Sequence, residues 1–183
     1  FHLRVPAWCI SPAVELNGQP LEVTTDENII RISREWKNGD QLKLTLPMEV
    51  SLTTWYENSK AVERGPLVYA LRIGETWQRI TNTKDPETYG DFFYEVKPFS
   101  PWNFGFPEKS VKESATAFRV VLKPMQDFPW NPENAPVELK TSGIRIPSWQ
   151  LYNGSAGPLP WSNMYKMELG DNHAGEEITL IPY

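Results

Sequence analysis

Apolar and polar residues alternate with a period of two from Phe1 to Arg72. This period places successive side chains on opposite faces of a sheet, so the region is predicted to be a β-meander. Asn17-Gly18 and Asn38-Gly39-Asp40 are predicted to be tight turns, because Asn and Gly tolerate positive φ. The apolar positions that define the strands are Phe1, Leu3, Val5, Val14, Leu16, Leu21, Val23, Ile30, Ile32, Leu42, Leu44, Leu46, Val50 and Leu52.

The segment 65–71, Gly-Pro-Leu-Val-Tyr-Ala-Leu, departs from this alternation because it is almost wholly apolar. Such a run is typical of a central strand that is covered on both faces. Just before it, residues 59–64 are expected to form about one helical turn, with Ser59 as its N-cap.

After Leu71 the chain becomes rich in Trp, Pro, Asn and Asp, with longer irregular stretches between strands, and a boundary is placed near Gly74. The helical period of 3.6 is not sustained in any segment, so the predicted class is all-β. We expect a jelly-roll-like β-sandwich domain over 1–74, closed by a strand in 176–183, and a second, smaller β-rich domain inserted at 75–175. Its strands are predicted at 92–96, 117–122, 137–139 and 144–146, with the closing strand at 178–181.

Composition narrows the functional classes. The 183 residues carry a formal charge of −5, which gives no basic patch for nucleic acid, and the longest apolar run, 66–71, is too short to cross a bilayer. Cys9 is the single cysteine, so an internal disulfide or a Cys-rich metal site is excluded. Because Phe1 lies inside a strand-like pattern, the chain is expected to be an excised or processed piece.

Several ordered motifs resemble the post-catalytic β-sandwich of glycoside hydrolase family 127, the β-L-arabinofuranosidases and their relatives. The second region resembles an extra domain often found in Bacteroidetes members. The motifs that carry the resemblance are Leu3–Trp8, Val14–Gly18, Trp36–Asp40, Leu46–Met48 and Val62–Ala70 in the first region, and Ser100–Gly105, Ile146–Trp149 and Leu180–Tyr183 in the second.

The resemblance implies a catalytic (α/α)6 barrel ahead of this region, with a cysteine nucleophile, a zinc site of Cys and Glu side chains, and an acid/base glutamate. Those motifs have no counterpart in this sequence. The expected function is therefore a non-catalytic accessory region that packs on the barrel domain of the same polypeptide and stabilises it. We expect zinc only in that domain and no cofactor here, with a plant-type glycan as a possible partner and a periplasmic or secreted location.

The candidate catalytic groups have simpler interpretations. Asp85, Glu87, Asp91 and Glu95 are expected to form a solvated acidic loop, with Asp85-Pro86-Glu87 starting a helical turn. Cys9 lies between Trp8 and Ile10 and is expected to be an inert, packed thiol. His2 and His173 are interpreted as surface residues.

Sugar binding has more support in the sequence, because an indole face can stack on a sugar ring while a neighbouring amide binds its hydroxyls. Three Pro-Trp loops fit this chemistry, and a structural role as loop plugs is the competing interpretation. The candidates are Trp102 with Asn103, Trp130 with Asn131, and Trp161 with Asn163. Trp8, Trp36 and Trp149 are expected to be core or interface plugs. Two alternatives stay open: an autonomous carbohydrate-binding module and, less well supported, a complete small hydrolase.

Overall fold

The computed structural model describes residues 1–154 and 175–183. Within them the protein consists mainly of antiparallel strands with a few short helices, so the predicted all-β class is confirmed. Among these residues, no helix combines the length and the apolar character that a membrane crossing requires.

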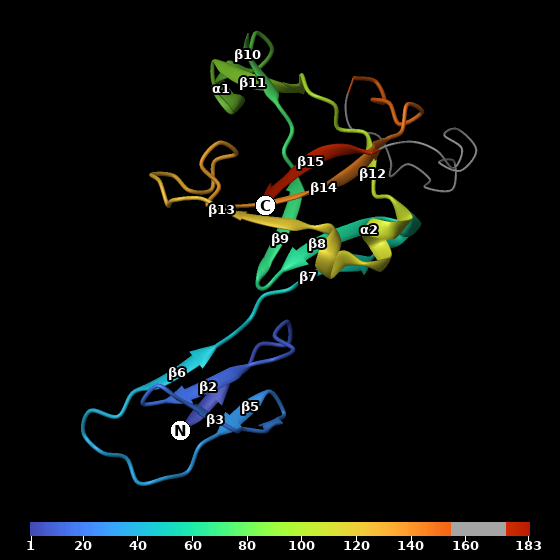
Figure 1. Cartoon of the computed structure of the whole chain (residues 1–183). Coiled ribbons are helices and arrows are strands. Elements are labelled where there is room, and N and C mark those ends of the chain that lie inside the picture. The colour runs from blue at the N-terminus through green and yellow to red at the C-terminus, as the bar shows by residue number, and fades with distance from the viewer. Residues whose placement is uncertain (155–174) are drawn as a thin grey trace.

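The N-terminal unit, residues 1–46, contains two small sheets around one core (Figure 1). One sheet has the strand order β1-β5-β4 and the other β3-β2-β6. Ile30 of β5 and Val14 of β2 are both buried in the shared core, together with Val5 and Cys9. The strands of the two sheets are β1 His2–Arg4, β2 Ala13–Leu16, β3 Gln19–Leu21, β4 Thr25–Asp26, β5 Ile29–Arg31 and β6 Leu42–Thr45.

The prediction of a meander is wrong for this unit, because β1 pairs with β5 and β2 pairs with β6. The hairpin at Asn17-Gly18 is confirmed: both residues have positive φ, 53° and 79°, between paired strands β2 and β3. Trp8 and Trp36 pack at the edge of the core, as expected of plugs.

A larger central sheet follows, with the order β12-β14-β15-β9-β8-β7 and β13 on the side of β14. A linker between β6 and β7 joins it to the N-terminal unit (Figure 1). Its strands are β7 Val50–Thr54, β8 Lys60–Arg64, β9 Leu67–Leu71, β12 Phe104–Gly105, β13 Arg119–Leu122, β14 Val137–Arg145 and β15 Glu176–Pro182.

One face of the central sheet carries a hydrophobic core. Leu139 of β14 and Leu180 of β15 are almost completely buried there, 0% and 3% exposed, with Phe118 packed among them. Two short helices, α2 Glu108–Lys112 and α3 Ser114–Ala117, lie between β12 and β13, and Phe106 meets Phe118 edge to face at 5.7 Å. The loop and helices around 106–118 therefore close this core.

Strand β15 joins the two halves of the central sheet. Leu180 lies opposite Leu71 of β9 on one side and opposite Leu139 of β14 on the other. Ile178 and Leu180 thus pack with Val62 and Tyr69 of the first region, as expected, and also with β14 of the second. The domain boundaries 1–74 and 75–175 stay a prediction.

Three local predictions were wrong. Residues 60–64 form strand β8, and a 3-10 turn at Tyr56–Asn58 precedes it, because the β7–β8 pairing overrides the local helix signal. Val68 in β9 is 45% exposed, so this central strand is covered on one face only. The strands expected at 137–139 and 144–146 are one strand, β14.

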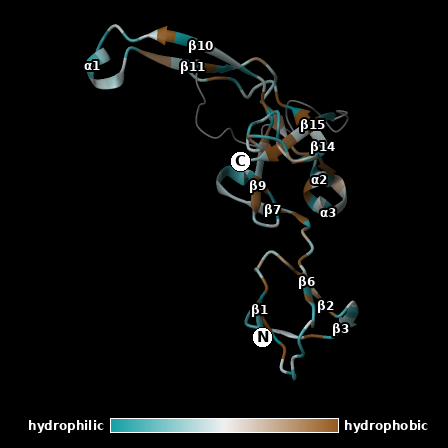
Figure 2. Ribbon diagram, turned by 90° about the vertical axis from the view of Figure 1, so that its left-hand side faces the viewer, coloured by the Kyte–Doolittle hydropathy of each residue, from teal (hydrophilic) through white to brown (hydrophobic). Residues whose placement is uncertain are grey.

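A two-stranded hairpin projects from the central sheet in both views (Figures 1 and 2). It consists of β10 Glu75–Thr81 and β11 Phe92–Pro98, with the helical turn α1 Pro86–Tyr89 at its tip. Asp85 caps α1 by accepting a hydrogen bond from the Thr88 amide at 3.2 Å, so the expected role of Asp85-Pro86-Glu87 is confirmed.

The turn at Lys37–Asp40 is held by one carboxylate. Asp40 accepts hydrogen bonds from the Lys37 amide and from Asn17 Nδ2, both at 2.9 Å, and Arg34 lies 3.5 Å from it. The backbone hydrogen bond, the Asn17 hydrogen bond and the Arg34 charge together lower the pKa of Asp40 below its usual value. The carboxylate thereby links this turn to the Asn17-Gly18 hairpin.

Replacing Asp40 with Asn should destabilise the protein near pH 7. A lowered folded-state pKa contributes stability above the unfolded pKa of about 3.9, and this stability is lost as the pH falls through the folded value. The gap between wild type and Asp40→Asn in urea denaturation should therefore shrink towards pH 2. Asp26→Asn, at the end of β4 in the same unit, is the control; a gap that does not depend on pH would contradict the prediction.

Candidate functional site

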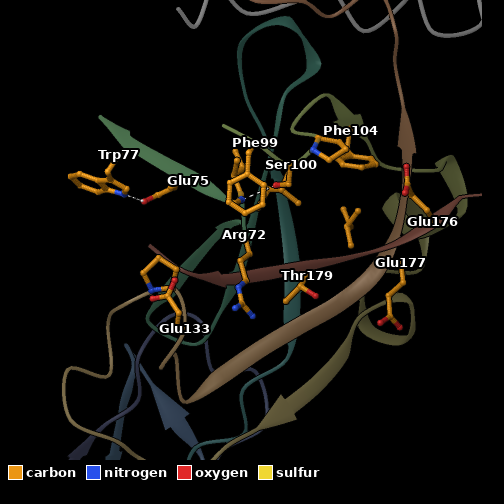
Figure 3. Close-up of a pocket in the computed structure, with 16 residues that line it drawn as sticks. Arg72, Glu75, Trp77, Phe99, Ser100, Phe104, Glu133, Glu176, Glu177 and Thr179 are labelled. Atoms are coloured by element: carbon orange, nitrogen blue, oxygen red, sulfur yellow. Dashed lines mark hydrogen bonds between the residues drawn. The ribbon is translucent and has the colours of Figure 1, made fainter. Parts of the chain in front are cut away.

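A cluster of aromatic and charged side chains lies where β9 leaves the central sheet and the chain enters the hairpin (Figure 3). A cavity of about 570 Å³ opens there between Arg72, the base of the hairpin and the first residues of β15. This volume is in the range of small-molecule sites. Polar and aromatic groups therefore line the same concave surface at this junction.

The base of the hairpin is closed by local hydrogen bonds. The Phe99 amide donates to the Gly74 carbonyl at 2.9 Å, and the Gly74 amide donates to Ser100 Oγ at 2.7 Å. The Phe99 ring packs directly on Gly74: a Cβ at residue 74 would lie 2.6 Å from the ring. A larger residue at position 74 would therefore displace the ring of Phe99, which is 73% exposed.

Trp77 and Glu75 form the wall on the hairpin side. The indole Nε1 of Trp77 donates to Glu75 Oε2 at 3.0 Å, which fixes the indole although 61% of the residue is exposed (Figure 3). Tyr94 on β11 adds an edge-to-face contact with Trp77, with the ring centroids 5.9 Å apart. The ring is therefore held from two sides while most of its surface faces solvent.

A buried carboxylate holds Arg72 in the lining of the cavity. Glu138 on β14 has a side chain only 5% exposed, and it accepts hydrogen bonds from Arg72 Nη1 at 3.2 Å and from Lys123 Nζ. Two cations around one carboxylate satisfy the buried charge and hold the Arg72 guanidinium at the cavity.

A second, exposed carboxylate has the same kind of surroundings. Glu177 on β15 contacts Lys140 at 3.2 Å and Arg119 at 3.1 Å. The hydrogen bonds from Lys140 and Arg119 lower the pKa of Glu177 below its usual value. Both carboxylates are thus engaged in ion pairs along one face of the sheet.

A second cavity, of about 670 Å³, adjoins the first. The two share Leu71, Ile73, Glu75 and Pro132 in their linings. Trp130, which is 65% exposed, and Tyr183 line the far side of the second cavity. We refer to these two adjoining cavities together as the groove; Trp77 lines the first cavity and Trp130 the second.

The predicted sugar-binding residues fall in different places. Trp130 is exposed on this groove and Asn131 is exposed beside it, in the loop that follows β13. Trp102 is half-buried, and Asn103 has a structural role: its Nδ2 donates to the Ile146 carbonyl at 2.8 Å, and its own carbonyl accepts from the Ile146 amide. Trp161 and Asn163 lie outside the described residues, as does His173.

Trp102 and Trp149 both line a shallow cavity of about 780 Å³ next to Phe99. Because the Asn103 amide nitrogen is engaged with the backbone there, the Pro-Trp-Asn motif at 101–103 fastens the loop to residue 146. Glycan binding by this loop stays a prediction.

Sequence reasoning missed Trp77, Glu75, Arg72 and Glu138. Glu75, Trp77 and Arg79 alternate in sequence and lie in strand β10. The change in composition after Leu71 hid this strand from the sequence analysis. Cys9 is buried in the core of the N-terminal unit, 7% exposed, in agreement with a packed thiol. In the part of the chain that the structure describes, no group of three His, Cys, Asp or Glu side chains is placed to hold a metal ion.

Removing the buried Glu138 carboxylate should be costly. Glu138→Ala removes two charge-assisted hydrogen bonds and leaves Arg72 and Lys123, whose side chains are 39% and 33% exposed, without their counterion; this loss should cost about 2 kcal/mol of unfolding free energy. The control Glu177→Ala removes a solvent-exposed carboxylate that also contacts two cations and should change stability little. Urea denaturation measures both; equal effects would show that burial is not what makes Glu138 important.

Comparison with known proteins places the first part of the chain in a family context. Residues 1–48 match the family model described as the middle domain of GH127 β-L-arabinofuranosidases, which confirms the resemblance to glycoside hydrolase family 127 over those residues. No curated protein matches the chain.

Solved structures match over the whole chain. One, described as a glycoside hydrolase, is 21% identical with a TM-score of 0.51, and the match covers 100% of this chain and 24% of that one. Another, a GH127 β-L-arabinofuranosidase from Geobacillus stearothermophilus T6, is 17% identical with a TM-score of 0.44, over 100% of this chain and 23% of that one. The chain thus spans about a quarter of the length of either structure.

Proposed function

We propose that the chain is a non-catalytic accessory β-region of a glycoside hydrolase of the β-L-arabinofuranosidase type. In this role it packs on a helical-barrel catalytic domain of the same polypeptide and stabilises it. The observation that carries the proposal is the match of residues 1–48 to the middle domain of that family. A middle domain has protein on both sides of it, and the matched structures are about four times as long as this chain.

The hairpin supplies a surface suited to such packing. Two-stranded hairpins are marginally stable on their own, so cover from another domain would stabilise this one. By the pairing register, Phe93 and Ile80 lie opposite each other on the face that turns away from Trp77, and Phe93 is 53% exposed. Packing of a second domain against this face would bury Phe93 and complete the exposed side of the hairpin.

The carboxylates around the groove are consistent with a structural role. Glycoside hydrolysis requires two carboxyl groups placed on either side of the scissile bond, one of them free to donate a proton. Glu138 and Glu177 each contact two basic side chains, and Glu75 accepts a hydrogen bond from Trp77. Glu133 and Glu176 also line the first cavity, so the assignment of the nucleophile, the acid/base group and the zinc to the catalytic domain rests on the family resemblance. The family resemblance is also the basis for a periplasmic or secreted location.

The packing can be measured on the longer protein that the proposal requires. Deleting residues 1–183 from it should lower the melting temperature of the remaining catalytic part, and adding the separate chain back should raise it. Phe93→Glu in the added chain should abolish that rise, whereas Met125→Glu, at an exposed position outside the hairpin, should not. Equal melting temperatures with and without the chain would contradict the accessory role.

The isolated chain should not hydrolyse an aryl β-L-arabinofuranoside, with or without zinc and reductant. Cys9 is enclosed in the N-terminal core, where a thiol cannot reach a substrate. Neither wild type nor Cys9→Ser should therefore hydrolyse the substrate. Release of the aryl group measures the rate of hydrolysis. Turnover by wild type that the substitution abolishes would instead make Cys9 the nucleophile and would refute the non-catalytic assignment.

A further inference from the structure

We propose that the groove between Trp77 and Trp130 binds a neutral oligosaccharide. This role goes beyond packing on a catalytic domain, and it uses the face of the hairpin that carries Trp77 rather than the face that carries Phe93. The two adjoining cavities, about 570 and 670 Å³, provide room for more than one sugar unit.

The two indoles are suited to stacking because they are exposed and also held in place. Trp77 is 61% and Trp130 65% exposed. Trp77 is fixed by its hydrogen bond to Glu75. Trp130 lies in a loop that Asn134 braces, with its Nδ2 donating to the Asp127 carbonyl at 2.9 Å and its amide donating to the Asn131 carbonyl at 3.0 Å. A pre-organised aromatic side chain loses little conformational entropy when a ligand stacks on it.

The stacking surface of the hairpin ends at Trp77. Further along the same face, the Arg79 guanidinium lies 4.0 Å from the centre of the Phe92 ring and covers it. The Tyr94 ring is tilted by 69° from the Trp77 ring and by 84° from the Phe92 ring, so these three rings do not form one flat surface. The geometry therefore directs a ligand from Trp77 into the groove and not outward along the hairpin.

Polar groups in the lining of the first cavity match sugar hydroxyls. Arg72 presents guanidinium donors, Glu133 a carboxylate acceptor and Thr179 a hydroxyl that can do both (Figure 3). Adjacent hydroxyls of a sugar can donate to a carboxylate and accept from a guanidinium, and such charge-assisted hydrogen bonds are strong. A sugar presents an apolar ring face and hydroxyls that both donate and accept hydrogen bonds. An indole face next to donors and acceptors is complementary to these features.

Charge selects a neutral sugar over an acidic one. Glu75, Glu133 and Glu176 line the first cavity, and Arg72, the single cation among its described lining residues, is already paired with Glu138. A uronate would bring its carboxylate towards these glutamates without a free cation to receive it. Anionic polysaccharides are therefore excluded from the groove.

Isothermal titration of the 183-residue chain with soluble arabinan, arabinoxylan and galactan tests the site, with polygalacturonate as the charged comparison. At least one neutral glycan should bind, and polygalacturonate should not. Trp77→Ala and Trp130→Ala should each weaken binding about tenfold or more, the scale expected from losing an aromatic contact and its buried area. Trp55→Ala is the matched control: Trp55 is 66% exposed and its indole N–H is also hydrogen-bonded, to Thr53 at 2.9 Å, but it does not line either cavity.

Thermal unfolding of each variant separates loss of binding from loss of fold, and Trp77→Phe and Trp130→Phe retain a ring if an alanine variant does not fold. Partial binding by the Phe variants supports the stacking role. Three results would overturn the proposal: binding of none of the glycans, equal weakening by Trp55→Ala, or tighter binding of polygalacturonate. None of them bears on packing against a catalytic domain, which the Phe93→Glu comparison tests separately.

Discussion

The insertion of β15 between β9 and β14 is the interaction on which the rest of the structure depends. Leu180 faces Leu71 and Leu139 across two ladders, so the C-terminal strand joins a meander from the first region to strands from the second. Without β15, the two halves would each expose a row of unpaired backbone groups and half of a hydrophobic core. The cost of closing so long a loop is offset by the burial of Ile178 and Leu180.

This pairing also creates the groove. Arg72 and Glu138 are 66 residues apart in the sequence, and they meet because their strands flank β15. The ion pairs among Arg72, Lys123 and Glu138 then fix the guanidinium at the edge of the cavity. A buried charge cluster of this kind stabilises little by itself, but it places charged groups at defined positions. Here the position is the junction where the chain leaves the sheet for the hairpin.

The two faces of the hairpin suit two different roles, glycan binding and packing of a further domain. Side chains alternate between faces, so Trp77 and Tyr94 lie on one side while Ile80 and Phe93 lie on the other. The first side continues into the groove and the second has no described partner in the chain. Packing of a further domain on the Phe93 side would stiffen the hairpin and hold Trp77 in place. The two proposed roles are therefore compatible in one protein.

The sequence by itself determined the all-β class, the Asn17-Gly18 turn, the burial of Cys9 and the cap at Asp85, because alternation, positive φ and capping are local properties. It did not determine which strands pair: β1 with β5 and β2 with β6 replace the expected meander. The helix signal at 59–64 yielded to pairing with β7, and Asn103 became a backbone clamp because residue 146 lies beside it. Strand partners, buried ion pairs and cavities depend on contacts between distant residues, and only the tertiary structure decides those.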